Sequence, residues 1–261
     1  MLFRVCKYLC FLCCIVGAVS YAENLELTEE HLQRIGDKIY KNETGGNEKY
    51  LIAWNAGESF ASLGLGHFIW FPEGLQSPFT ETFPALVEYL HAQGVALPMW
   101  LLKTKDAPWG SKDLFLQAQD SQEMKDLRQL LRTSFPYQVK FIHKRMQQSL
   151  PLILSTLKNP ASQQVVKRRF LSLAETELGM YALIDYVNFK GEGVSAKERY
   201  QGQGWGLLQV LLGMDAKSKD LNQAFSESCK RVLTKRVENS PQQATEEKWL
   251  AGWIKRCNTY K

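Results

Sequence analysis

The sequence predicts a mainly α-helical fold that includes one small β element. Over most of the chain after residue 27, apolar residues recur at spacings of three and four, which is typical of helices packed on a core. Residues 49–71 depart from this pattern and are rich in β-branched, aromatic and glycine residues. The composition, with 45% hydrophobic and 23% charged residues, supplies enough apolar material for a core. No Pro-rich or Ser/Gly-rich linker divides the chain, so we expect one domain over residues 23–261.

The first 22 residues have the pattern of a secretory signal peptide. Arg4 and Lys7 precede an apolar run that extends over residues 8–19, and Ser20 and Ala22 occupy the −3 and −1 positions of a cleavage site. The run is short for a membrane span, which needs about 20 residues. We therefore expect cleavage after residue 22 and a periplasmic or secreted protein without a membrane span. An uncleaved membrane anchor is the alternative.

Cleavage changes the cysteine and charge balance. Four cysteines leave with the segment: Cys6, Cys10, Cys13 and Cys14. Cys229 and Cys257 remain, and in an oxidising compartment they could form a disulfide or stay as two thiols. The formal net charge of +5 falls by two with Arg4 and Lys7, and so mild an excess does not indicate a nucleic-acid partner.

The first predicted helix follows Thr28, which is a favourable N-cap residue with two glutamates behind it. Its apolar face consists of Leu32, Ile35 and Ile39. Gly45 and Gly46 end it. After the helix, the apolar segments YLIAW (50–54) and FASLGLGHFIWF (60–71) flank the turn NAGES, which predicts a β-hairpin or a small sheet.

The rest of the chain predicts helices and one loop. The helices are expected near residues 80–94, 121–133, 137–158, 161–175, 178–189, 204–214, 225–235 and 245–256. Residues 98–112 are expected to form a loop. The segment LGMYALIDYVNF (178–189) is apolar on nearly all sides, which is typical of a buried central helix.

Glu43 lies four residues after Ile39 and therefore continues the apolar face of the first helix. Partial burial and the negative end of the helix dipole should both raise the pKa of its carboxyl. A glutamic acid that stays protonated near neutral pH can act as a general acid. On this basis, Glu43→Gln should leave the stability of the fold unchanged or slightly increased. The alternative is a frayed helix end with Glu43 in water.

The order of these elements resembles the phage-type lysozymes of the lysozyme-like superfamily. The resemblance rests on IGDKIYKNETGG (35–46) followed by the β element and SLGLGHFIW (62–70), and covers about residues 30–70. A looser resemblance over residues 180–260 rests on ALIDYVNFKGEG, LLQVL, RVENSP and GWIKRCNTY. Together, the two resemblances imply a lysozyme-like α+β domain, with a small β-hairpin or sheet next to the catalytic helix and a large helical lobe.

The resemblance also implies roles for residues around the hairpin. Glu43 matches the general acid of the family, and Ser62 matches a threonine that helps to position a water molecule. Glu58 is the nearest hairpin carboxylate and is either the second catalytic carboxylate or an exposed turn residue. His67 matches a histidine that supports the fold beside the substrate.

Two further sets of residues are candidates for substrate binding. Asp185, Asn188 and Glu192 would share one face of the central helix, where they could bind sugar hydroxyls or N-acetyl groups, or hydrogen-bond to their own neighbours. Several aromatic rings could either stack on sugars or belong to the core: Trp54, Trp70, Tyr186 and Trp205.

These features predict a secreted muramidase-like glycosidase that cleaves the glycan strand of peptidoglycan. Either a water molecule or the hydroxyl of the substrate itself, as in lytic transglycosylases, would attack the sugar. The alternatives are a chitosanase-like glycosidase acting on a related amino-sugar polymer, and a non-catalytic glycan-binding protein. The four histidines lack metal-ligand spacing and no phosphate-binding loop is present, so we expect no cofactor and no metal. We also expect a monomer.

Overall fold

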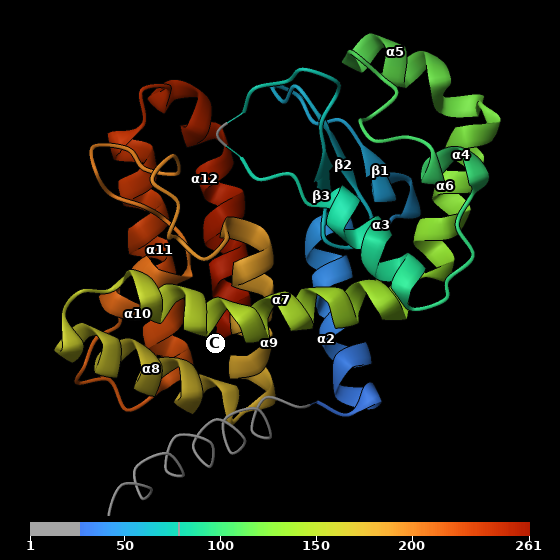
Figure 1. Ribbon diagram of the computed structural model, residues 1–261. Coiled ribbons are helices and arrows are strands. Elements are labelled where there is room, and N and C mark those ends of the chain that lie inside the picture. The colour runs from blue at the N-terminus through green and yellow to red at the C-terminus, as the bar shows by residue number, and fades with distance from the viewer. Residues whose placement is uncertain (1–26, 78) are drawn as a thin grey trace, which may run out of the picture.

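A computed structural model describes residues 27–77 and 79–261. The protein is mainly helical and contains a small three-stranded antiparallel sheet, as the sequence predicts (Figure 1). The predicted signal peptide lies outside the described residues. Within them, no helix combines the length and the apolar character that crossing a membrane would need.

Within the described residues, the first ten elements are, in chain order, α2 (Glu29–Thr44), η1 (Glu48–Leu51), β1 (Ile52–Ala53), β2 (Ala61–Leu63), β3 (Phe68–Trp70), α3 (Phe83–Ala92), α4 (Met99–Leu102), α5 (Lys112–Gln117), η2 (Ala118–Asp120) and α6 (Gln122–Thr133). The remaining elements are α7 (Phe135–Thr156), α8 (Pro160–Ala174), α9 (Glu177–Lys190), α10 (Leu207–Gly213), α11 (Leu221–Asn239), α12 (Gln243–Cys257) and η3 (Asn258–Tyr260).

Helix α2 begins and ends where the sequence indicates. The Thr28 hydroxyl accepts a hydrogen bond from the backbone N–H of His31, which caps the first turn. At the other end Gly45 adopts a φ of 61°, and its N–H donates to the carbonyl of Lys41. The predicted apolar face is buried: Leu32, Ile35 and Ile39. Glu43 therefore stands in the last turn of a helix whose rotation about its axis is set by the core.

The sheet has the strand order β1-β2-β3 and pairs Ile52 with Leu63 and Leu63 with Phe68. Two residues with a positive φ lie in the turn between β2 and β3. Gly64 has a φ of 70° and donates its N–H to the carbonyl of Leu51, and His67 has a φ of 47°. A positive φ is uncommon for a residue with a Cβ and is often found at functional sites.

The region between β3 and α6 corrects one prediction. Residues 98–112 are not a continuous loop, because α4 forms a single helical turn within them. Trp109 is buried in this region and its ring contacts the rings of Trp70 and Phe115. The Trp100 ring of α4 also stacks on Trp70 of β3, with ring centroids 6.4 Å apart, so α4 packs against the sheet.

The long helix α7 joins the two halves of the fold. In Figure 1 it runs across the molecule, with α2, α3 and the sheet toward one end and α8 to α11 toward the other. It contacts α2, α3, α8 and α9. Helix α9 is buried from Gly179 to Val187, in agreement with the apolar pattern of its sequence.

Helices α11 and α12 pack against each other in the C-terminal half. A disulfide between Cys229 and Cys257 joins them, with the two Cα atoms 5.9 Å apart. Because α12 ends at Cys257, the disulfide ties the last turn of this helix to α11, and η3, which follows it, contacts α9. The side chains that meet there form the candidate site.

Candidate functional site

Glu43 lies at the junction of α2, α9, α12 and the turn between β2 and β3. Its side chain is 10% exposed. Arg256 Nη2 donates a hydrogen bond of 2.7 Å to Glu43 Oε1, and Asn188 Nδ2 lies 3.3 Å from the same oxygen. His67 Nδ1 lies 3.4 Å from the other carboxylate oxygen, Oε2. The sequence prediction that Glu43 faces inward agrees with this placement.

Arg256 is held in place by a second buried carboxylate. Its Nε and Nη2 each donate a hydrogen bond of 2.8 Å to Asp185, which is fully buried. Tyr260 donates its hydroxyl proton to Asp185 over 2.6 Å. Such a two-point contact between a guanidinium and a carboxylate fixes the orientation as well as the charge. Arg256 is thereby aimed at Glu43.

The ion pair with Arg256 reverses the expected direction of the pKa shift of Glu43. Burial raises the pKa of Glu43, as the sequence suggests, but the attraction of Arg256 and His67 and the hydrogen bond from Arg256 outweigh it. The net pKa of Glu43 is lowered below its ordinary value. The prediction of a raised pKa was wrong, because it considered only burial and the helix dipole and could not include a cation 213 residues away. Glu43 is ionised at neutral pH.

Glu58 is the second carboxylate of the site and has the opposite tendency. It follows β1 in the connection to β2, is half-buried, and accepts hydrogen bonds from Asn55 Nδ2 at 3.0 Å and Ser62 Oγ at 3.4 Å. Burial raises the pKa of Glu58, and the hydrogen bonds and the neighbouring His67 and Lys190 offset this only in part. His67 and Lys190 also lower the pKa of Glu43, so the charges of the same two side chains act on both carboxyls.

Two buried polar atoms in the site have no partner among the described residues. These are His67 Nε2 and Asn188 Oδ1. Asn188 uses its Nδ2 for Glu43 and for the carbonyl of Gly66 at 3.2 Å, which leaves its oxygen free. A buried donor or acceptor without a partner costs free energy, and native proteins rarely leave one without a reason. Both unpartnered atoms belong to side chains that also contact the Glu43 carboxylate, Asn188 at Oε1 and His67 at Oε2.

Lys190, the last residue of α9, lies beside this network. Its Nζ is 4.1 Å from the ring centroid of Phe189 and 3.8 Å from that of Trp253. The Arg256 guanidinium carbon lies 4.1 Å from the same Phe189 ring, so the two cations share one aromatic neighbour. Burial lowers the pKa of Lys190 well below its ordinary value, and the charges of Arg236 and Arg256 lower it further.

The aromatic residues proposed as sugar platforms are buried. Trp54, Trp70, Tyr186 and Trp205 are between 0% and 7% exposed. Trp54 Nε1 donates to the backbone carbonyl of Glu58, and the Tyr186 hydroxyl donates to the carbonyl of Trp205, each over 2.8 Å. Their rings pack in the core, which is the second of the two alternatives that the sequence left open, and these four residues are not sugar platforms.

The polar stripe predicted on the central helix is also corrected. Of the three residues, Asn188 is the one that contacts Glu43. Asp185 is fully buried and orients Arg256 instead of lining a cleft. Helix α9 ends at Lys190 and Gly191 adopts a φ of 70°, so Glu192 leaves the helical face and lies 4.0 Å from Arg145.

Sequence reasoning missed Arg256, Tyr260 and Lys190. Arg256 and Tyr260 lie within GWIKRCNTY, but local periodicity does not say which distant carboxylate a cation will meet. One signal was present in the sequence. Glu43 and Asp185 both lie on helix faces that the sequence predicts to be buried, and a buried carboxylate needs a cation as its partner.

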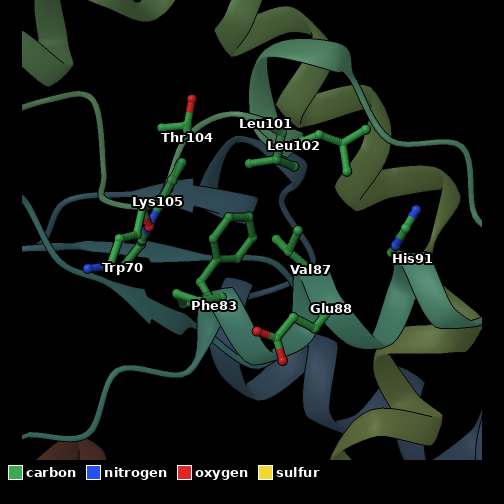
Figure 2. A pocket seen from close by; sticks show the side chains of 10 residues that line it. Trp70, Phe83, Val87, Glu88, His91, Leu101, Leu102, Thr104 and Lys105 are labelled. Atoms are coloured by element: carbon green, nitrogen blue, oxygen red, sulfur yellow. The ribbon is translucent and has the colours of Figure 1, made fainter.

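A separate pocket lies on the side of the sheet that carries α3 and α4. Figure 2 shows Phe83 and Val87 of α3 pointing into it, with Glu88 and His91 on the same helix. Its volume is about 270 Å³, and its lining includes Trp70 and Lys105 but none of the side chains that surround Glu43. The pocket is therefore distinct from the carboxylate pair. Within residues 27–77 and 79–261, no group of three His, Cys, Asp or Glu side chains is placed to hold a metal ion.

Comparisons of the chain with models of known protein families, with curated proteins and with solved structures find no match.

Proposed function

We propose that this protein is a lysozyme-like glycosidase that cleaves the glycan strand of peptidoglycan or of a related amino-sugar polymer in the periplasm or outside the cell. The observation that carries the proposal is the pairing of Glu43, at the end of a core-packed helix, with Glu58, in the connection between β1 and β2, since His67 and Lys190 act on the pKa of both carboxyls. The environments of the two carboxyls push their pKa values in opposite directions. Glycoside hydrolysis uses two carboxyl groups of which one is protonated and the other ionised.

In this proposal Glu43 donates a proton to the glycosidic oxygen. Glu58 and Ser62 hold the water molecule that attacks the sugar. The sequence resemblance to phage-type lysozymes supports this assignment, as does the order of helix, sheet and large helical region. The unpartnered Asn188 Oδ1 and His67 Nε2 would form hydrogen bonds with sugar hydroxyls or an N-acetyl group.

The charges around the site favour the opposite distribution of protons in the free protein. Arg256 keeps Glu43 ionised, whereas burial favours the neutral form of Glu58. Glu43 must therefore gain its proton in the complex, or Glu58 is the acid and the ionised Glu43 stabilises positive charge on the sugar. Both assignments need the same two residues and predict different behaviour of the variants.

The first experiment incubates purified peptidoglycan with the wild type, Glu43→Gln and Glu58→Gln, and identifies the released fragments by mass spectrometry. New reducing ends support a hydrolase, and anhydro ends support attack by the hydroxyl of the substrate. We expect each substitution to lower the rate by about 100- to 10,000-fold, which is the usual contribution of a general acid or base. Full activity in Glu43→Gln would contradict the proposal.

A second substrate shows whether Glu43 or Glu58 is the general acid. An aryl glycoside of an amino-sugar oligomer has a leaving group that departs without a proton, so loss of the acid costs much less than on the polymer. If Glu43 is the acid, Glu43→Gln retains activity on the aryl glycoside and Glu58→Gln does not. The reverse result assigns the acid to Glu58.

One observation favours a second candidate, a non-catalytic glycan-binding protein. Glu43 is tied into the ion-pair cluster with Arg256 and Asp185, which could be purely structural. A binder would sediment with peptidoglycan and release no fragments, and Glu43→Gln would bind as the wild type does. Fold alone does not decide between these functions.

A further inference from the structure

We infer that Lys190 is a recognition site for a carboxylate on the glycan, so that this protein selects an acidic amino-sugar strand over a neutral one. The inference rests on the proposed function, because it concerns the substrate of the same site. It starts from the observation that Lys190 is a half-buried lysine beside the Glu43 network with no anionic contact among the described residues.

The nearest groups to the Lys190 ammonium are aromatic. Its Nζ lies over the Trp253 ring at 3.8 Å and near the Phe189 ring at 4.1 Å. It makes no ion pair or hydrogen bond with another residue in the part of the chain that the structure describes. An ammonium group has three N–H donors, and aromatic faces satisfy its charge only in part.

The neighbouring cations differ from Lys190 because each has a direct partner. Arg236 donates to both oxygens of Glu246 at 2.9 and 3.0 Å, and Arg256 is bound by Asp185 and Glu43. Burial is the main reason that the pKa of Lys190 is lowered, and the charges of Arg236 and Arg256 lower it more than those of Glu246 and Glu43 raise it. A position with this balance of charge favours an anion over a second cation.

Lys190 lies near Glu43, so an anion bound by Lys190 would belong to a substrate that is bound at Glu43 and Glu58. Asn188, two residues earlier on α9, contacts Glu43, and Lys190 influences the pKa of both Glu43 and Glu58. The exposed Trp249 continues beyond Trp253 on α12, with ring centroids 6.0 Å apart. A chain of sugars bound at Glu43 that runs over α12 would bring a substituent to Lys190.

A carboxylate suits this position better than a neutral oxygen. It would accept charge-assisted hydrogen bonds from the Lys190 ammonium, and the half-buried setting between two rings strengthens an ion pair relative to water. Muramic acid residues carry such a group on their lactyl ether when the stem peptide is absent. A carboxylate of the stem peptide is the other source of the same chemistry.

The test compares glycan strands that differ only in this charge. Strands freed of stem peptides are used with their carboxylates intact or converted to methylamides, and binding is measured by calorimetry in the Glu43→Gln background so that the strands stay whole. We expect binding to the carboxylate strands to be at least about tenfold tighter, which is typical of a hydrogen bond to a charged group. Lys190→Met should abolish this preference and Lys190→Arg should retain much of it.

Lys144→Met is the matched control, because Lys144 also lies near an aromatic ring, that of Tyr89, but is exposed on α7. It should keep the full preference, and thermal unfolding of all variants checks that each is folded. Peptide-bearing strands identify the source: tighter binding to them than to the bare strands assigns the carboxylate to the peptide.

Equal binding of the two kinds of strand, or a preference that survives Lys190→Met, would overturn the inference. The proposed function would still stand if the wild type cleaves both kinds of strand. If the wild type neither binds nor cleaves any strand, both proposals fail together.

Discussion

Arg256 and Glu43 are 213 residues apart in sequence and are joined by a hydrogen bond of 2.7 Å from Nη2 to Oε1. The same guanidinium contacts Asp185 through two hydrogen bonds. Burial lowers the pKa of Arg256, but the two carboxylates raise it well above its ordinary value, so this cation stays charged. Arg256, in the last turn of α12, thereby favours the ionised form of Glu43, in the last turn of α2.

Substitution of Arg256 by methionine should destabilise the fold strongly. It leaves two buried carboxylates, Glu43 and Asp185, without their cation, and breaking a buried pair in this way costs about 3–5 kcal/mol. The loss should be smaller at low pH, where the carboxylates can be neutralised. Urea unfolding at pH 7 and at acidic pH measures both effects.

Arg34→Met is the matched control for Arg256→Met. Arg34 also binds a glutamate through two points of contact, with Nη2 2.8 Å from Glu177 Oε2, but its side chain is 48% exposed. Exposed pairs contribute about 0–1 kcal/mol. If the two substitutions cost the same, the Arg256 cluster does not have the energetic role assigned to it.

Glu43→Gln should lower stability at neutral pH, whereas Glu58→Gln should not. The pKa of Glu43 is lowered in the folded state, so its contribution is present above the unfolded pKa of about 4.3 and disappears as the pH falls through the folded value. Glu43→Gln should therefore lower the free energy of unfolding at pH 7 by about 1–3 kcal/mol, the usual effect of losing a charged hydrogen-bond partner. This replaces the sequence-based expectation of unchanged or increased stability.

The pKa of Glu58 is raised, so ionisation of Glu58 opposes folding as the pH rises through the unfolded and then the folded pKa. Glu58→Gln should hold or increase stability at pH 7 and have little effect below the unfolded pKa. Chemical unfolding of both variants between pH 3 and 8 tests the signs. Destabilisation of similar size at pH 7 in both would contradict the assigned environments.

The parts of the site that depend on local sequence were predicted well. The Thr28 cap, the Gly45 stop and the spacing of four from Ile39 to Glu43 involve neighbouring residues only, and each is found in the structure. Long-range partners could not be predicted in this way. The expected pKa of Glu43 had the wrong sign because Arg256 arrives from the other end of the chain.

The errors on the substrate-binding residues have the same origin. Residues 185, 188 and 192 share a face only if the helix continues, and Gly191 ends it. Whether Trp54 or Trp70 presents a free ring depends on how α4 and α5 fold over the sheet, and residues 98–112 had been predicted as a loop. Helical periodicity gives the inward face of an element but not the element that covers it.

Removal of the disulfide by Cys229→Ala with Cys257→Ala should lower stability and also loosen the site. The bond closes a loop with a sequence separation of 28, for which the chain-entropy model gives about 3–4 kcal/mol. Cys257 directly follows Arg256, so the guanidinium should hold Glu43 less rigidly. We expect a lower urea midpoint and, in NMR titration, a Glu43 pKa closer to its ordinary value. An unchanged Glu43 pKa would show that Asp185 alone positions Arg256.

Gly66→Ala should disturb the site from the sheet side. A methyl group at position 66 would lie 2.7 Å from Asn188 Oδ1 and 2.8 Å from the ring of Phe68, which is buried. Overpacking of this kind costs about 1–3 kcal/mol. It should also displace the Asn188 carboxamide, which donates to both the Gly66 carbonyl and Glu43. Any glycan-cleaving activity should therefore fall by more than the loss of stability explains.

Gly252→Ala provides the control for Gly66→Ala. Gly252 is exposed in the middle of α12 and has nothing within 4 Å of an added Cβ, so alanine should stabilise the helix by about 0.5–1 kcal/mol. Urea unfolding should thus move in opposite directions for the two glycines. If Gly66→Ala is as stable as the wild type and keeps its activity, the backbone at residue 66 can move away from Asn188, and the close approach of the sheet to α9 is not required for the arrangement around Glu43.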